Sequence, residues 1–429
     1  MTEIFVIGAG ASGMMAAIEA SREALRLNKK VNIIILEHNN THGRKLLATG
    51  NGRCNLTNKQ LDIRCFRSHD MEWLESYLNS NNNDMADKII SYFEELGMMC
   101  TDKNGYIYPY SCQASTVNDI LYDSCLTYGV SFIFDAHVLE VKPYENKGYF
   151  IKTSEGYTDN TGNRKKRRNE YIADKVIMAC GSKAYPKLGA DGSSYKLVSD
   201  IGLKVIDIVP ALTGLKCRGK YFELAAGART NAKLSLYVDH ELTAVDKGEL
   251  QLTDYGISGI PVFQISRYAS YGLADGCKVH CDIDFMPEYS LDNVLEKITH
   301  SIKLREESDL YTILCGMLNN RIVHMLLAYC KIDEKIKGCD LTDIQVNDVA
   351  EAIKSFYAVI VGTNDYEQSQ ICAGGVKLSE LNETFESVRM SGLYVTGELL
   401  DVDGMCGGYN LHWAWISGMT AGRNAVKGK

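Results

Sequence analysis

The stretch Glu3–Glu37, EIFVIGAGASGMMAAIEASREALRLNKKVNIIILE, decides the fold of the chain. A short apolar run is followed by a glycine turn, a segment whose apolar residues have helical spacing, and a second apolar run that ends in an acid. This order predicts a strand, a helix and a second strand within about 35 residues, the length of a parallel crossover unit. The chain therefore opens with a β-α-β unit.

The glycine turn has the pattern G-x-G-x-x-G, formed by Gly8, Gly10 and Gly13. The first glycine permits a tight turn, the second lets the backbone approach a pyrophosphate, and the third lets helix and strand pack closely. The helix N-terminus offers free N–H groups and the positive end of its dipole to phosphates. Glu37 ends the second strand, where an acid accepts hydrogen bonds from a ribose diol. The pattern predicts a site for NAD or FAD, and the acid argues against the 2′-phosphate of NADP.

The segment Gly392–Gly422, GLYVTGELLDVDGMCGGYNLHWAWISGMTAG, distinguishes the two dinucleotides. A short strand is followed by Gly397, and Gly407 and Gly408 open a long helix. A flavin needs a second contact near its ribityl chain, and its N1/O2 edge becomes negative on reduction, a charge that a helix N-terminus stabilises. The C-terminal segment offers both features and therefore favours FAD.

The chain has 429 residues, a net charge of −8 and 14 cysteines. The length predicts more than one domain, and the negative charge gives no overall basic footprint for nucleic acid. The cysteines are scattered without a C-x-x-C pair, so we expect reduced thiols and no metal site. The first residues resemble no signal peptide, and the longest uncharged stretch carries five glycines. We therefore expect a cytoplasmic protein without a membrane span.

The patterns that follow predict insertions into the nucleotide-binding fold. Strand patterns dominate from about Ile201 to Asp284, helical patterns from Leu291 to about Cys330, and the C-terminal end returns to a strand, a glycine loop and a helix. The predicted bounds are 1–200 and 369–429 for the nucleotide-binding domain, 201–285 and 346–368 for a β-rich domain, and 286–345 for a helical insertion.

Five consecutive basic residues, Arg164–Arg168, interrupt two strand-like segments. Such a run can bind nucleic acid or act as a targeting signal, but one exposed run in an acidic chain is weak evidence for either. We interpret it as a solvated hairpin loop. Nucleic acid is therefore not expected as a partner.

Two long motifs indicate a family. They are Gly43–Asn58, GRKLLATGNGRCNLTN, and Gly397–Gly418, GELLDVDGMCGGYNLHWAWISG. Together they resemble the BaiN-like, or YhiN-type, FAD-binding flavoproteins of bacteria, also described as aminoacetone-oxidase-like. The resemblance implies an α/β fold with a glutathione-reductase-like FAD domain of Rossmann type, an inserted β-barrel-like domain and a small helical domain. It also implies that FAD is bound non-covalently.

Carried over residue by residue, the resemblance implies cofactor contacts from both motifs and from the segments between them. The implied and predicted contacts are Gly8, Gly10, Ala11, Ser12, Gly13, Glu37, Arg44, Lys45, Asn51, Val138, Gly181, Gly397, Glu398, Gly408, Asn410 and Leu411. Arg44 and Lys45 are expected to meet phosphate charge, so we interpret the first motif as a wall of the flavin site. The chain departs from the family where Ser182 replaces a second glycine and where Glu398 replaces a frequent aspartate.

Candidate acid–base groups lie in the same two motifs. His412, Tyr409 and Arg53 are the predicted catalytic residues, and Arg53 could instead hold the flavin edge or a substrate carboxylate. A dithiol mechanism through Cys54 and Cys406 is not favoured, because a small residue filling a tight place explains each thiol. No second strand-G-x-G-x-x-G-helix unit is found, so NADH or NADPH is expected only as a transient electron donor.

A bound flavin supplies the redox chemistry, and the resemblance implies an FAD-dependent oxidoreductase acting on a small organic molecule. Two reactions remain open. One is NAD(P)H-driven reduction of a carbon–carbon double bond in an enone or bile-acid-like substrate, which we favour; the other is oxidation of a small amine with release of hydrogen peroxide. A flavin-binding interaction protein that contacts RNA or a protein partner is a third hypothesis, supported by the basic run alone. The substrate and the oligomeric state are not defined by the sequence.

Overall fold

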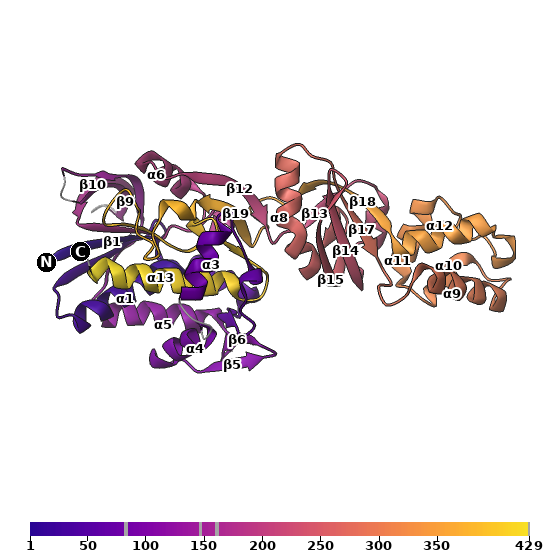
Figure 1. Ribbon diagram of the computed structural model, residues 1–429, viewed down its shortest axis with the longest axis horizontal. Helices are drawn as coiled ribbons and strands as arrows, with labels where there is room; N and C mark the ends of the chain where they lie inside the picture. Colours follow the sequence, from indigo (N-terminus) through magenta and orange to yellow (C-terminus); the bar gives the residue numbers. More distant parts are fainter. Residues whose placement is uncertain (81–84, 146–147, 159–162, 428–429) are drawn as a thin grey trace. The chain divides into compact units, whose positions relative to one another are not determined.

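The computed structural model describes residues 1–80, 85–145, 148–158 and 163–427. The chain forms two compact units, Met1–Ile208 with Ile371–Lys429, and Val209–Gln370. The first unit is thus built from both ends of the chain, as the indigo and yellow segments of Figure 1 show. The finer division into three domains stays a prediction.

A five-stranded parallel sheet forms the centre of the first unit, in the order β20-β11-β1-β2-β7. Its central strand, β1 (Thr2–Ile7), has a buried apolar run typical of a strand covered on both faces. Ile7 pairs with both Leu36 and Met178, so the carboxyl ends of three strands meet at one edge, where open parallel sheets bind ligands. The other four strands are β2 (Val31–Leu36), β7 (Ser131–Ile133), β11 (Lys175–Met178) and β20 (Leu393–Val395).

The first and last helices of the chain, α1 (Ala11–Arg26) and α13 (Tyr409–Lys427), lie side by side (Figure 1). Gly418 and Gly422 make this approach close. A Cβ atom at Gly418 would lie 2.5 Å from the carbonyl oxygen of Ser12, and one at Gly422 would lie 2.2 Å from that of Ala16. The predicted C-terminal return is therefore packed directly on the predicted dinucleotide helix.

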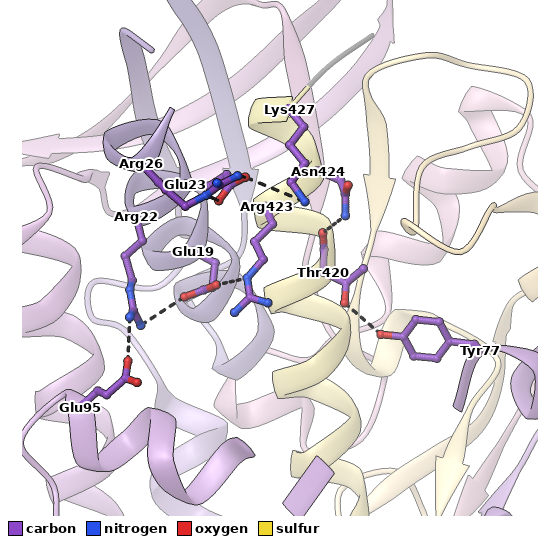
Figure 2. Close-up of polar contacts among 10 residues, drawn as sticks. All are labelled: Glu19, Arg22, Glu23, Arg26, Tyr77, Glu95, Thr420, Arg423, Asn424 and Lys427. Carbon is purple, nitrogen blue, oxygen red and sulfur yellow. Dashed lines mark hydrogen bonds and ion pairs between the residues drawn. The ribbon is translucent and has the colours of Figure 1, made fainter. Parts of the chain in front are cut away.

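Ion pairs strengthen the same packing (Figure 2). The carboxylate of Glu19, in α1, is 3% exposed and accepts a hydrogen bond from Arg423 Nε, in α13. Its other oxygen lies 3.4 Å from Arg22, which also pairs with Glu95 in α4 at 2.7 Å. A buried carboxylate requires such partners, since leaving it unpaired is costly. The other helices of this unit are α2 (Arg44–Ala48), α3 (Met71–Ser80), α4 (Met85–Glu95), α5 (Ala114–Thr127) and α6 (Ser193–Ile201).

A three-stranded antiparallel sheet contains β8 (Ala136–Pro143), β9 (Tyr149–Thr158) and β10 (Arg164–Ala173). The basic run Arg164–Arg168 lies in β10, so its interpretation as a loop was wrong. The strand forms because each of these residues pairs with β9, and an edge strand tolerates charge on its solvent side. Residues 159–162, which separate the two strands in the sequence, lie outside the described residues.

Shorter strands complete the first unit and its borders. They are β3 (Thr57–Asn58), β4 (Phe66–Arg67), β5 (Cys100–Lys103), β6 (Tyr106–Pro109), β12 (Val205–Ala211), β19 (Ile371–Val376) and β21 (Asp403–Gly404). Within the described ranges, no helix is both long and apolar enough to cross a membrane.

The second unit is a closed six-stranded barrel with helices inserted between its strands. Alternate residues of its strands, such as Leu234, Leu236 and Ile283, are fully buried and form a separate core. The barrel consists of β13 (Leu215–Cys217), β14 (Arg229–Val238), β15 (Glu241–Thr253), β16 (Gly256–Ser258), β17 (Val279–Asp284) and β18 (Phe356–Thr363). Its helices are α7 (Tyr221–Ala225), α8 (Ile260–Ala274), α9 (Leu291–Leu304), α10 (Leu310–Cys315), α11 (Asn320–Cys330) and α12 (Asp343–Lys354). The predicted α/β fold with an inserted barrel and helical part is confirmed.

Candidate cofactor site

A cleft opens at the carboxyl edge of the parallel sheet in the first unit. It contains about 1110 Å³ of space, including volume open to solvent. Strand ends, three helix N-termini and the short helix α2 contribute to its wall. The predicted contacts that line it are Gly8, Gly10, Ala11, Ser12, Glu37, Arg44, Lys45, Val138, Gly181, Glu398, Asn410 and Leu411. The fold thus brings residues from both ends of the chain, from Gly8 to Leu411, to one cavity.

The three glycines of the first turn differ in what requires them. A Cβ atom at Gly8 would lie 2.5 Å from the Ala179 carbonyl oxygen, and one at Gly13 would lie 2.0 Å from the Gly8 carbonyl oxygen. At Gly10 a Cβ atom would meet no described atom within 4 Å, and the residue faces the cleft. Packing explains Gly8 and Gly13, but the space beside Gly10 suits a ligand that approaches the backbone.

Two long helices direct their N-termini at the cleft. Residues 10–12 of the α1 turn and Asn410 and Leu411 of α13 line it. In the described residues, neither helix has an acid in its first turn, and the N-cap residue of α1, Gly10, makes no side-chain capping bond. The positive ends of both helix dipoles are therefore available to an anionic ligand.

Glu37 is buried at the end of β2 with its carboxylate beside the glycine turn. One oxygen accepts from the Ala9 N–H at 2.8 Å, and the other accepts from the backbone and side-chain nitrogens of Asn39 at 2.8 and 2.7 Å. A carboxylate has about four acceptor positions, so these bonds fix the group and leave room for a further donor. This arrangement fits the predicted ribose contact.

The two predicted phosphate-binding cations are already paired within the protein. Arg44 donates to the side chain of Asn39 at 2.7 Å and to the carbonyl oxygen of Lys187 at 2.9 Å. Lys45 Nζ lies 2.5 Å from Glu398 Oε2. The positive charge of Lys45 is therefore directed to a carboxylate that lies 353 positions later in the chain.

Four predicted contacts do not line the cleft: Gly13, Asn51, Gly397 and Gly408. Gly397 packs on Ser12 behind the wall, and Gly408 packs against Asn55, where a Cβ atom would lie 2.8 Å from the side-chain oxygen. Asn410 lines the cleft, but its side chain accepts from the Gly404 N–H at 2.8 Å and donates to the Gly404 carbonyl at 2.9 Å. The amide side chain therefore holds the preceding loop.

The first motif has more regular structure than its sequence suggests. Residues 44–48 form α2, Thr49–Gly52 form a 3-10 turn, and Thr57–Asn58 form β3. Leu46 and Thr49 line the cleft, whereas Asn51 and Arg53 are exposed and do not. The wall formed by this motif ends at Thr49 within the described cavity.

The predicted catalytic groups of α13 are buried away from the cleft lining. His412 is fully buried, and its Nδ1 atom lies 2.8 Å from Thr57 Oγ1. Burial lowers the pKa of His412 to about 3, so the imidazole is neutral at neutral pH. Tyr409 donates its hydroxyl hydrogen to the Gln60 carbonyl oxygen at 3.1 Å, and burial raises its pKa. Residues that exchange protons with a substrate are expected to face it, but neither His412 nor Tyr409 lines the cleft.

The two cysteines considered for a dithiol are poor nucleophiles. Cys54 is fully buried, and burial raises the pKa of its thiol to about 12. Burial also raises the pKa of the Cys406 thiol. A protonated thiol is not the reactive form. Within the described parts of the chain, no group of three His, Cys, Asp or Glu residues has the arrangement of a metal site.

Sequence reasoning missed the wall contributed by residues 188–194 and by His38 and Asn39. Asp191 forms a turn at the entry to α6 by accepting from the N–H and hydroxyl of Ser193 at 2.9 and 2.6 Å. The LGADGSS sequence, with its turn glycines and an Asx–Ser pair before a helix, is the signal that could have identified this third helix N-terminus. His38 and Asn39 follow the ribose acid directly and could have been identified by adjacency.

Comparison with known proteins places the chain among flavoproteins. The family model described as HI0933-like protein Rossmann domain matches residues 2–424. The 3-dehydro-bile acid delta(4,6)-reductase of Clostridium scindens is 38% identical over 428 residues, and the match covers 100% of both chains. The ribosomal RNA dihydrouridine synthase of Haemophilus influenzae is 26% identical over 427 residues, covering 97% of this chain and 96% of the relative. The structure of 3-ketosteroid-delta4-(5alpha)-dehydrogenase from Rhodococcus jostii aligns with a TM-score of 0.47 at 14% identity, covering 99% of this chain and 97% of the other.

The family match confirms the resemblance predicted from the two motifs. The glycine turn, the ribose acid and the two helix N-termini of the cleft fit the adenosine, diphosphate and flavin parts of FAD. The chain belongs to the HI0933-like family, and it is an FAD-dependent oxidoreductase.

Proposed function

We propose that this chain reduces a carbon–carbon double bond conjugated to a carbonyl group, with NADH or NADPH as electron donor. The observation that carries the proposal is the 38% identity to a bile acid reductase along the full length of both chains. The more distant relatives are named dihydrouridine synthases. Both names denote saturation of a double bond next to a carbonyl, which supports the reaction class more than any one substrate.

The small-molecule substrate is proposed to be a cyclic enone, with a steroid-like 3-oxo-4-ene as the first candidate. FAD, when bound, supplies hydride transfer. The protein must bind the enone, stabilise the negative charge that develops on its carbonyl oxygen, and direct a proton to the α-carbon. Arg53 is exposed and carries several N–H donors, so we propose that it binds the carbonyl oxygen or an acidic substituent of the substrate.

We assign His412 a positioning role in this proposal. A fully buried, neutral imidazole lacks the charged form that a general acid supplies near neutral pH. Its bond to Thr57 instead joins α13 to the end of the first motif, which carries Arg53. Tyr409 Oη keeps its proton at neutral pH and is proposed to hold Gln60 in the same segment.

The proposal is tested with FAD-loaded protein under anaerobic conditions. We expect NADH or NADPH to bleach the flavin absorbance, a steroid 3-oxo-4-ene to restore it, and mass spectrometry to find a product heavier by two hydrogens. The matched variants are Arg53→Met and Arg64→Met, because Arg64 is also exposed and, among the residues that the structure describes, pairs with its neighbour Asp62. Arg53→Met should lower kcat/KM for the enone by about tenfold or more, and Arg64→Met should leave it unchanged.

Other outcomes would replace the proposal. Hydrogen peroxide release with small amines in air, without enone turnover, would support the amine oxidase. Conversion of uridine in ribosomal RNA fragments without enone turnover would support an RNA substrate. Salt-dependent RNA binding that depends on Arg164–Arg168, without turnover of any of these substrates, would support an interaction protein.

A further inference from the structure

We infer that Lys45 and Ser182 act on the cofactor through Glu398, as positioning residues, and that Lys45 is not a phosphate-binding cation. Three segments that are far apart in sequence meet at this carboxylate. Lys45 belongs to α2, Ser182 follows β11, and Glu398 lies in the 3-10 turn after β20. Lys45 and Glu398 line the cofactor cleft.

Both partners bind the same oxygen of Glu398. Lys45 Nζ lies 2.5 Å from Oε2, and Ser182 Oγ donates to Oε2 at 2.9 Å. No described residue donates a hydrogen bond to Oε1 within bonding distance. The carboxylate is therefore fixed by one oxygen, and the other is left to accept a hydrogen bond in the cleft.

The Ser182 hydroxyl is already hydrogen-bonded within the protein. It is fully buried, and its hydroxyl oxygen accepts from the Ala184 N–H at 3.2 Å while its hydrogen points to Glu398. The side chains of Lys45 and Glu398 are 23% and 21% exposed, so their attraction is only partly screened by solvent. The pair would lose this attraction if Lys45 turned to a phosphate.

The free oxygen of Glu398 suits a hydroxyl donor and repels an anion. FAD carries hydroxyl groups on its ribityl chain, whereas its diphosphate has only acceptors at neutral pH. The N-termini of α1 and α13, which have no acid in their first turns, are the expected partners of the diphosphate. The geometry therefore assigns Glu398 to the ribityl side of FAD, with Lys45 and Ser182 holding it there.

ADP separates this inference from phosphate binding by Lys45, because ADP contains the diphosphate and no ribityl chain. The experiment measures dissociation constants of FAD and ADP for apoprotein, by flavin fluorescence quenching and calorimetry. The variants are Ser182→Ala, Glu398→Gln and the charge-balanced pair Lys45→Met with Glu398→Gln. Arg64→Met serves as a control that removes one exposed cation outside the cleft lining.

We expect Ser182→Ala to weaken FAD by about tenfold, the loss of one bond to a charged group, and to leave ADP within about twofold of wild type. The Lys45→Met, Glu398→Gln pair should match Glu398→Gln alone for FAD and wild type for ADP. A loss of ADP affinity in the charge-balanced pair would overturn the inference and make Lys45 a phosphate ligand. Unchanged FAD affinity in Ser182→Ala, in protein with unaltered circular dichroism and melting temperature, would also overturn it.

The inference rests on FAD binding and not on the proposed enone reaction. Binding of FAD and ADP to apoprotein is measured without substrate or reductant. A protein that binds FAD as expected and reduces no enone would therefore refute the proposed function and leave this inference standing.

Discussion

Thr57 Oγ1 and His412 Nδ1 lie 2.8 Å apart, although 355 positions separate the two residues in the chain. Thr57 ends the first family motif and His412 lies in the first turns of α13, within the second. Both side chains are fully buried. The two motifs that indicate the family are thus joined by a buried polar contact in the protein itself.

Loss of the threonine hydroxyl should destabilise the fold. Thr57→Val keeps the shape of the side chain but leaves the imidazole without this partner, which costs about 1–3 kcal/mol. Urea unfolding of the apoprotein measures the change. Thr243→Val, at an exposed position of β15, should shift the unfolding free energy by less than about 0.5 kcal/mol. Equal effects of the two substitutions would mean that the Thr57 bond contributes nothing.

The neutral state of His412 predicts a pH dependence of stability. Its folded-state pKa of about 3 lies below the unfolded value of about 6.5, so the unfolded state takes up the proton first as the pH falls. The stability contributed by the neutral form is present above about pH 6.5 and is lost towards about pH 3. His412→Gln removes this titration. Between about pH 7 and pH 4, wild type should lose on the order of 3 kcal/mol more than the variant, and parallel curves in urea unfolding would contradict the assignment.

Gly10 and Gly13 should respond differently to the same substitution. Gly10→Ala meets no described atom, so the apoprotein should unfold within about 0.5 kcal/mol of wild type, whereas FAD affinity should fall by about tenfold or more. Gly13→Ala places its Cβ 2.0 Å from the Gly8 carbonyl oxygen and should cost about 2 kcal/mol or more in unfolding free energy. Retained FAD affinity in Gly10→Ala would show that the open space is not used by the cofactor.

We expect that the close packing of α13 on α1, and not helix flexibility, requires a glycine at position 418. In a free helix, Gly→Ala gains about 1 kcal/mol. Here Gly418→Ala would bring its Cβ to 2.5 Å from the Ser12 carbonyl oxygen, and we expect a loss of about 2 kcal/mol or more because α1 and α13 must separate. Thermal unfolding of the apoprotein measures it. A stabilised variant would mean that the two helices can move apart at no cost.

The sequence predicted local units well and long-range side-chain pairs poorly. Gly8, Gly13 and Glu37 follow rules that depend on neighbours within one β-α-β unit, and the structure gives each a local reason. Lys45 was expected at phosphate, but it pairs with Glu398, and no local pattern reports a contact across 353 positions. Asn410 is similar, because its side chain is used by Gly404 in a loop whose conformation is not encoded by a periodic pattern.

The basic run of β10 shows a different limit of prediction from sequence, which concerns secondary structure. Lysine has low strand preference, and five basic residues together suggest solvent exposure. The predicted exposure was right, since all five residues of Arg164–Arg168 are exposed. Pairing with β9, however, makes the segment a strand. Tertiary pairing overrode local preference, and only the neighbouring strand could have revealed it.

Anaerobic titration of the FAD-loaded protein tests the central claim most directly. We predict that the purified protein holds one FAD per chain, that NADH or NADPH reduces it, and that a steroid 3-oxo-4-ene reoxidises it while gaining two hydrogens. A protein that takes up no FAD would contradict the cofactor site. A protein that takes up FAD and is reoxidised by oxygen alone would contradict the proposed double-bond reduction.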